Sequence, residues 1–354
     1  RLKEENRREY AHAFYLNRVG HNPVYESCDF CYFPLGDDWF KDLLVKLREA
    51  KEYIFIEIFI LANEKMWGQI LEILEAKVAE GVEVRVLYDG TCSLTLLPHN
   101  YPEQLRMKGI KCKVFNPIVP LIKTSYNNRD HRKIVVIDGE YAYTGGCNIA
   151  DEYINQKERF GHWKDSMARL SGDAVNSFCV LFLEMWNIDV YRDEENYAFY
   201  QRKNQRHGEG YLICFGDDPL DNMPLGKETY LHILENAHEK VDIIMPYFVV
   251  DGAFLETILH TALKGIQIRL ILPGIPDKKL VNYVAKTYYR DLLSSGIEIY
   301  EYSPGFTHAK MMLADGDKAL FGTINLDYRS FYLHFEDGVY LYKVPEISKM
   351  SQDF

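Results

Sequence analysis

The residues best suited to chemistry occur twice in this chain, in one fixed pattern. The pattern is His-x-Lys-x4-Asp-x6-Gly-x2-Asn, and its two copies lie 177 residues apart. The copies contain His131, Lys133, Asp138 and Asn148, and then His308, Lys310, Asp315 and Asn325. Five identities in the same register indicate an internal duplication. Polar residues that recur on otherwise apolar segments indicate a functional site.

Each copy is expected to present an imidazole beside an ammonium group. Residues two apart in a β-strand share a face, and the apolar segments after Lys133 and Lys310 are typical of strands. The Asp-Gly pairs at Asp138 and Asp315 favour hairpin turns, so these carboxylates are expected to hold the turns more than to touch a substrate. The small residues that follow let a ligand approach the backbone, and the asparagines add amide donors.

Two such halves, related by a pseudo-twofold axis, would gather two histidines, two lysines and two asparagines around one point. Lysine and amide donors suit phosphoryl oxygens. One imidazole can attack phosphorus while the other protonates the leaving oxygen. Because the lysines supply positive charge and no carboxylates cluster as they do around Mg²⁺, the sequence predicts no metal and no cofactor. The alternative is that these side chains are structural or solvated.

A nucleophilic imidazole needs a partner that orients its other ring nitrogen. Asp165 follows His131 by 34 residues, and Glu336 follows His308 by 28 residues. A later strand is therefore expected to bring one carboxylate behind the imidazole in each half. The alternative, a solvated surface acid at each position, is equally consistent with the spacing.

The similarity between the halves continues upstream of the motifs and indicates the elements that position them. The segment starting at Ala50 resembles the one starting at Ala237, and the segment at Gly81 resembles the one at Gly265. Each half has the pattern of helices that alternate with apolar strands, which is typical of a largely parallel sheet covered on both faces. The predicted helices include residues 37–50, 66–80, 226–240 and 253–264.

The sequence thus predicts an α/β protein made of two similar α/β/α sandwich halves related by a pseudo-twofold axis. Residues 1–35 form an N-terminal extension, 36–190 the first half, 191–210 a polar connector and 211–354 the second half. The first half carries about ten extra residues between Pro117 and His131. This apolar insertion, from Ile118 onward, is expected either to dip into a bilayer interface or to pack on the protein.

Composition limits the classes of function. The 354 residues carry a net charge of −11, and their ordinary globular composition rules out disordered, collagenous and coiled-coil chains. Such acidity disfavours binding to nucleic acid. Seven scattered cysteines argue against a disulfide framework and favour a reducing compartment. No apolar run reaches the length of a membrane span, and the chain begins at Arg1, so we expect an engineered or processed start.

At these motifs the chain resembles the phospholipase D superfamily, which is defined by paired His-Lys-Asp motifs. Within it, HRKIVVIDGEYAYTGGCNIADEY and SPGFTHAKMMLADGDKALFGTINLDYRSFYLHFE are similar to bacterial cardiolipin synthases. The resemblance covers nearly the whole chain from about residue 20. It departs from the superfamily pattern at Gly146 and Thr323, where serine is common and where a substrate contact is expected.

The resemblance implies a two-step phosphatidyl transfer between two molecules of phosphatidylglycerol, which gives cardiolipin and glycerol through a phosphatidyl-histidine. It assigns the nucleophile to His131 and the acid and base steps to His308. It counts Asp138 and Asp315 with the catalytic motifs, and it places Asp165 and Glu336 behind the imidazoles. It also implies a peripheral position on a bacterial cell membrane, with a native membrane anchor that is missing from this chain. The cysteines favour the cytoplasmic face.

Two other classes of function remain open from the sequence. A phospholipase D or a nucleic-acid phosphodiesterase would use the same residues with water as the acceptor. A catalytically inactive lipid-binding scaffold would keep the fold, although two intact motifs argue against it. The sequence does not establish the oligomeric state.

Overall fold

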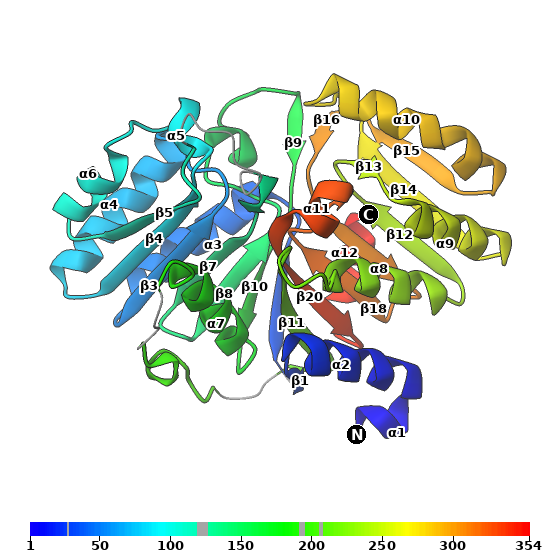
Figure 1. Cartoon of the computed structure of the whole chain (residues 1–354), viewed down its shortest axis with the longest axis horizontal. Coiled ribbons are helices and arrows are strands. Elements are labelled where there is room, and N and C mark those ends of the chain that lie inside the picture. Colours follow the sequence, from blue (N-terminus) through cyan, green and yellow to red (C-terminus); the bar gives the residue numbers. More distant parts are fainter. Residues whose placement is uncertain (27, 119–126, 191–194, 205–207) are drawn as a thin grey trace.

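Two large mixed sheets, one from each half, form the centre of the protein (Figure 1). The structure is a computed structural model that describes the chain except for residues 27, 119–126, 191–194 and 205–207. Most of the insertion after Ile118 and part of the connector therefore lie outside the described residues.

The two sheets have matching strand orders. The first runs β2 (Asp29–Phe33), β10 (Met167–Ser171), β8 (Tyr141–Gly145), β7 (Lys133–Ile137), β3 (Tyr53–Ile58), β4 (Glu83–Asp89) and β5 (Lys111–Phe115). The second runs β1 (Val24–Glu26), β11 (Tyr211–Asp217), β20 (His334–Tyr342), β18 (Lys318–Gly322), β17 (Met311–Ala314), β12 (Lys240–Ile244), β14 (Gln267–Pro273) and β15 (Glu298–Tyr302). The six strands from β10 to β5 thus correspond in order to those from β20 to β15, as a duplication requires.

The expectation of a largely parallel sheet was wrong. Among the described residues, the parallel neighbours are β3, β4 and β5 in the first sheet and β12, β14 and β15 in the second, together with the short strand β6 (Arg129–Asp130) beside β20. The motif strands β7 and β17 run antiparallel to their neighbours on both sides. The Asp-Gly turn after each motif strand sends the chain directly back, so no crossover helix is available to make that pair parallel.

Helices cover both sheets near the positions that the sequence predicts. The described helices are α1 (Leu2–Glu5), α2 (Arg7–Gly20), α3 (Gly36–Glu49), α4 (Lys65–Ala79), α5 (Cys92–Thr95), α6 (Tyr101–Met107), α7 (Val175–Trp186), α8 (Leu225–Glu235), α9 (Gly252–Leu263), α10 (Lys279–Ser294), α11 (Tyr328–Tyr332) and α12 (Ile347–Asp353). None of these helices is long and apolar enough to cross a membrane.

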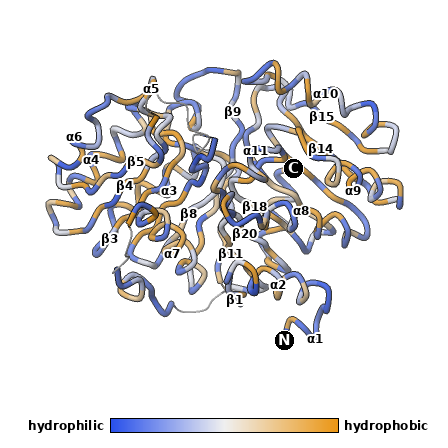
Figure 2. The backbone as a smooth tube through the Cα atoms, in the orientation of Figure 1, coloured by the Kyte–Doolittle hydropathy of each residue, from blue (hydrophilic) through white to orange (hydrophobic). Residues whose placement is uncertain are grey.

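A shared hydrophobic core joins the halves. It combines Phe55, Ile134 and Phe182 of the first half with Met311 and Phe321 of the second, all fully buried. Helix α7 contacts β3, β7 and β8 of the first half and β11 of the second. Apolar stretches run through the central strands, and hydrophilic ones lie mostly at the periphery (Figure 2). The halves are therefore packed into one body.

The N-terminal extension contributes to both halves. Strand β1 pairs with β11 at the edge of the second sheet, and β2 pairs with β10 at the edge of the first. Two further short pairs cross between the halves beside the motifs: β6 (Arg129–Asp130) with β20, and β9 (His162–Lys164) with β16 (Gly305–Thr307). Strand β13 (Phe248–Val249) pairs with β19 (Leu326–Asp327) within the second half.

The motif aspartates fix the turns, as their Asp-Gly sequence suggests. Asp138 and Asp315 have φ angles of 55° and 54°, in the left-handed region that these turns require. The Asp138 carboxylate accepts the backbone N–H groups of Lys51, Glu52 and Tyr53, at 2.7–2.8 Å. Asp315 accepts three N–H groups in the same way, at 2.9–3.1 Å. Each carboxylate thereby ties its turn to the start of the neighbouring strand.

Replacing Asp138 should affect stability more than catalysis. Asp138→Ala leaves three N–H groups near the start of β3 without their acceptor, so we expect the free energy of unfolding to fall by about 3 kcal/mol. Glu140→Ala, which removes an exposed acid from the same turn, should cost under about 1 kcal/mol. Urea unfolding followed by circular dichroism measures both. Unchanged stability with lost turnover in Asp138→Ala would place this residue in the catalytic machinery instead.

Candidate active site

The two motifs meet at one cleft between the halves, with a volume of about 610 Å³. Among the predicted site residues, the cleft is lined by His131, His308, Asn148 and Asn325. The other predicted residues lie behind this surface. The convergence expected from a pseudo-twofold arrangement is therefore present in the structure.

The carboxylates behind the imidazoles come from the opposite halves. His131 Nδ1 donates to Glu336 Oε2 at 2.8 Å, and His308 Nδ1 donates to Asp165 Oδ2 at 2.7 Å. Both carboxylates are completely buried, so neither is a solvated surface acid. The expected pairing within each half was wrong, because the intervals along the chain do not show which half a strand end faces.

The backbone explains why the pairs cross. The N–H of His131 donates to the carbonyl of Phe335, and the N–H of His308 donates to the carbonyl of Lys164. These bonds continue the β6–β20 and β9–β16 pairs by one step, with 2.9 and 2.7 Å between donor and acceptor. Each carboxylate follows directly after the residue that accepts this bond. Each histidine is therefore held, by backbone and side chain, against the other half.

The two positions that depart from the superfamily pattern support the carboxylates. A Cβ atom on Gly146 would lie 1.9 Å from Asp165 Oδ1, so a side chain there would displace the Asp165 carboxylate. The Thr323 hydroxyl donates to Glu336 Oε2 at 2.5 Å and accepts the Asp337 N–H at 2.9 Å. Neither residue lines the cleft. The substrate contact expected at these positions is replaced by a contact with the carboxylates.

The motif lysines lie beneath the histidines. Lys133 Nζ donates to the carbonyl oxygen of His131 at 2.5 Å, and Lys310 Nζ donates to that of His308. Lys310 Nζ also lies 2.9 Å from His308 Nδ1. Both side chains are at most 1% exposed. The ammonium groups thus add positive charge beneath the cleft floor.

Burial shapes the acidity of all four basic groups. It lowers the pKa of His308 to about 4, with the charge of Lys310 adding to the effect and Asp165 opposing it. Burial also lowers the pKa of Lys310 to about 7, and those of His131 and Lys133 below their usual ranges. An anion that enters the cleft therefore raises the pKa of each group, because it stabilises the positive charge that burial disfavours.

The asparagines play unequal parts. Asn148 Oδ1 accepts the N–H of Ile60 at 2.9 Å, and Asn148 Nδ2 donates to the Tyr153 hydroxyl at 2.7 Å. In the described part of the chain, Asn325 Oδ1 is buried without a hydrogen-bond partner. Asn148 mainly fixes the cleft wall, whereas Asn325 retains hydrogen-bonding capacity for a ligand.

Asp138 and Asp315 stand outside this set. Each lies at the far end of its motif strand from the histidine, and neither lines the cleft. The structure thus supports the turn-holding role and not a direct part in catalysis for these two members of the motif.

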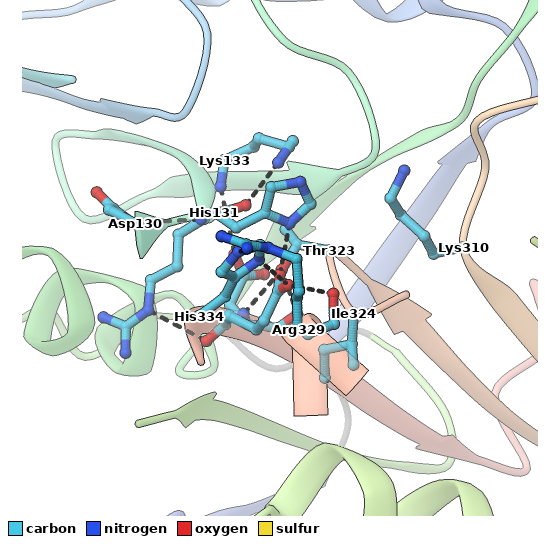
Figure 3. Close-up of polar contacts among 12 residues, drawn as sticks. Asp130, His131, Lys133, Lys310, Thr323, Ile324, Arg329 and His334 are labelled. Carbon is cyan, nitrogen blue, oxygen red and sulfur yellow. Dashed lines mark hydrogen bonds and ion pairs between the residues drawn. The ribbon is translucent and has the colours of Figure 1, made fainter. Parts of the chain in front are cut away.

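Several residues that line the cleft were not predicted from the sequence. On the second-half side they include His334 and Arg329, and on the first-half side Trp163 and Tyr153. Figure 3 shows His334 and Arg329 clustered with His131. The sequence contained one indication of them. His334 and Trp163 each lie two residues before the carboxylate that contacts the histidine of the other half.

One group among the described residues has the composition of a metal site. Ligand-type atoms of His131, His334 and Glu336 all lie within 4.8 Å of one another. The Glu336 carboxylate is already engaged by His131, by Thr323 and by the Ser330 hydroxyl at 2.7 Å. We therefore assign this group to a hydrogen-bond network centred on Glu336.

Comparison with known proteins places this site in a family. The family model described as "Cardiolipin synthase, PLD-like domain" matches residues 43–167 and again 230–354. The fold is also that of Haemophilus influenzae phosphatidylserine synthase, with a TM-score of 0.73, 15% identity, and coverage of 98% of this chain and 88% of that one. The protein is thus a duplicated enzyme of the phospholipase D superfamily.

Relatives with higher sequence identity show which family within the superfamily the chain belongs to. A Streptococcus mutans protein described as uncharacterized is 46% identical over the whole of this chain and 77% of its own length. A cardiolipin synthase of Alkalihalophilus pseudofirmus is 33% identical over 96% of this chain and 67% of its own length. The chain belongs to the cardiolipin synthase family of phospholipase D-like proteins.

The crossed pairs predict which limb of the pH profile each carboxylate controls. Asp165→Asn removes the anion that favours protonated His308, so the pKa of His308 falls. If His308 is the acid, the alkaline limb of kcat moves to lower pH, and turnover falls by about two to four orders of magnitude. If His131 is the nucleophile, Glu336→Gln lowers its pKa, so the acid limb moves to lower pH. An exchange of these two effects would indicate pairing within each half.

Proposed function

We propose that this protein transfers a phosphatidyl group from one phosphatidylglycerol to another and releases cardiolipin and glycerol. The observation that carries the proposal is the pair of imidazoles facing one cleft, each with Nδ1 held by a buried carboxylate from the opposite half. That arrangement leaves both Nε2 atoms for phosphoryl chemistry. The names of the relatives supply the choice of lipid.

In the first step, His131 Nε2 attacks the phosphorus of the donor lipid. The new N–P bond replaces the bond from phosphorus to the glycerol headgroup, and His308 gives its proton to the departing glycerol oxygen. Glu336 accepts the hydrogen bond from His131 Nδ1 and so stabilises the positive charge that develops on the ring. The intermediate is a phosphatidyl-histidine.

In the second step, the hydroxyl of another phosphatidylglycerol attacks the intermediate. His308 takes the proton of that hydroxyl, the N–P bond breaks, and His131 returns to its starting state. Two phosphatidylglycerols thus become one cardiolipin and one glycerol, and each histidine is restored. Asp165 stabilises His308 while it carries the proton.

The lysines stabilise the phosphoryl group through charge. The negative charge at phosphorus increases as it becomes five-coordinate, and two buried ammonium groups beneath the cleft offset that charge without a metal. Burial holds the pKa of Lys310 at about 7, so an incoming anion raises it and draws a proton into the site.

Lysine function can be measured by proton uptake as well as by rate. At pH 8, above the pKa of Lys310 in the empty site, binding of vanadate should take up close to one proton. Calorimetry in buffers of different ionisation enthalpy measures this number, and Lys310→Met should reduce it. The same variant should lose at least about two orders of magnitude in turnover while remaining folded. Near-normal turnover in Lys310→Met would contradict the role.

Hydrolysis is the second candidate, because water can replace the lipid hydroxyl in the second step without any change in the residues. Trp163, Tyr153 and Phe306 form an aromatic wall around His308. This wall favours transfer, since it restricts the access of water to the histidine that activates the acceptor. A nucleic-acid substrate is disfavoured by the net charge of −11.

One assay separates these functions. The protein is incubated with phosphatidylglycerol vesicles, and the lipid and water-soluble products are identified by mass spectrometry. Cardiolipin with an equal amount of glycerol supports the transferase, whereas phosphatidic acid identifies a phospholipase. Vesicle binding without turnover would identify a lipid-binding scaffold.

The proposal also assigns the protein a peripheral place on the cytoplasmic face of a bacterial membrane.

A further inference from the structure

The surroundings of the two histidines break the twofold symmetry of the site. In the short strand pairs beside the motifs, His334 is the register partner of Arg129, and Trp163 is the register partner of Phe306. Arg129 and Phe306 each lie two residues before their motif histidine. His131 therefore has a flank of arginine and histidine, and the matching flank of His308 is made of two aromatic rings.

His334 contacts the network that orients His131. Its ring centroid lies 5.4 Å from that of His131, and its Nδ1 lies 3.6 Å from Glu336 Oε1. Arg329 Nε donates to His334 Nε2 at 3.3 Å, which leaves the ring proton on Nδ1, the atom that faces Glu336 (Figure 3). Glu336 thus lies between two imidazoles, with one carboxylate oxygen toward each.

The charged groups around His334 come from four elements and from His131 itself. Glu336 lies on its own strand, β20; Arg329 lies on α11; Asp327 is in β19; and Arg129 is its register partner in β6. The positive charge of Arg329 and the negative charges of Glu336 and Asp327 therefore surround the His334 ring. His334 thus lies in the same cluster of charged groups as the pair of His131 and Glu336.

The sign of the effect of His334 on His131 follows from electrostatics. A proton on His334, or its Nδ1–H dipole, attracts the negative charge of Glu336 and repels a proton on His131. Both effects lower the pKa of His131, whose burial already lowers it. Trp163, the counterpart beside His308, carries no titratable group and exerts no such effect.

We propose that His334 is a positioning residue that keeps His131 unprotonated and thereby selects His131, of the two motif histidines, as the nucleophile. The proposal rests on the proposed function, since it concerns the attack on phosphorus. In this role, His334 acts through Glu336 and needs no contact with the substrate. The duplication supplies two equivalent histidines, and the flank of Arg129 and His334 gives His131 a different environment from that of His308.

The test isolates the attacking imidazole by removing the need for an acid. A phosphatidyl ester of p-nitrophenol has a leaving group that departs without protonation, so the pH dependence of the first-turnover release of p-nitrophenolate reports the protonation of the nucleophile. His334→Asn should move the acid limb of this profile up by about one pH unit. His334→Lys, with a fixed positive charge, should move it down.

A matched control removes a histidine outside the cleft. His162 lies next to Trp163 and contacts the Tyr302 hydroxyl at 2.8 Å. His162→Asn should leave the acid limb where it is. Opposite shifts in the two His334 variants are not expected of a residue that only maintains the fold, and thermal unfolding confirms that each variant is folded.

The outcomes distinguish this inference from the proposed function. Acid limbs that coincide in wild type, His334→Asn and His334→Lys would overturn the role of His334 and leave the transferase intact. Equal shifts in one direction for both variants would also overturn it, because a charge effect must change sign. Absence of any release from the wild-type protein would instead contradict the proposed function.

Discussion

The structure depends on two histidines whose hydrogen bonds reach across the boundary between the halves. Each imidazole is oriented by a carboxylate from the other half, and each histidine N–H is bonded to the backbone immediately before that carboxylate. Separation of the halves would break both histidine–carboxylate pairs together with the backbone bonds beside them. The site and the association of the halves are therefore maintained by the same contacts.

This arrangement explains how a duplicated fold produces an asymmetric reaction. Each half supplies one imidazole, one lysine and one carboxylate, so the two halves contribute the same kinds of functional group. Burial disfavours positive charge on both imidazoles and both lysines, and an entering phosphodiester anion reverses this preference. Under the role that we propose for His334, the different flanks decide which imidazole attacks. A covalent two-step reaction needs such a difference, because one ring must be unprotonated while the other carries the proton.

Much of the fold was predictable, because repeated residues in constant register imply repeated structure. The helices were placed within a few residues, except that α8 ends at Glu235, before the predicted end at residue 240. The sheet direction was not predicted correctly, since apolar runs show that a strand is buried and not which way its neighbour points. The Asp-Gly turns at Asp138 and Asp315 were the available clue to the antiparallel pairs.

The site was predictable as far as the motifs extend. His131, His308 and the asparagines meet at the cleft, and Asp165 and Glu336 lie behind the imidazoles. The crossing of the carboxylates could not be predicted, because both pairings satisfy the same spacing along the chain. The role of Gly146 depends on the close approach of Asp165, a contact between residues that lie far from each other in the pattern of the motif. His334 was missed because no repeated partner marked it.

The most direct test of this account is the location of the covalent intermediate. His308→Ala lacks the acid and the base, so a phosphatidyl ester with a p-nitrophenolate leaving group should still load it, and the adduct should persist. Mass spectrometry of the acid-sensitive phosphoramidate should then find the label on His131, and His131→Ala should carry none. A label on His308 in His131→Ala, with none on His131 in the reverse variant, would show that the roles are exchanged. A label on neither histidine in any variant would contradict the covalent mechanism.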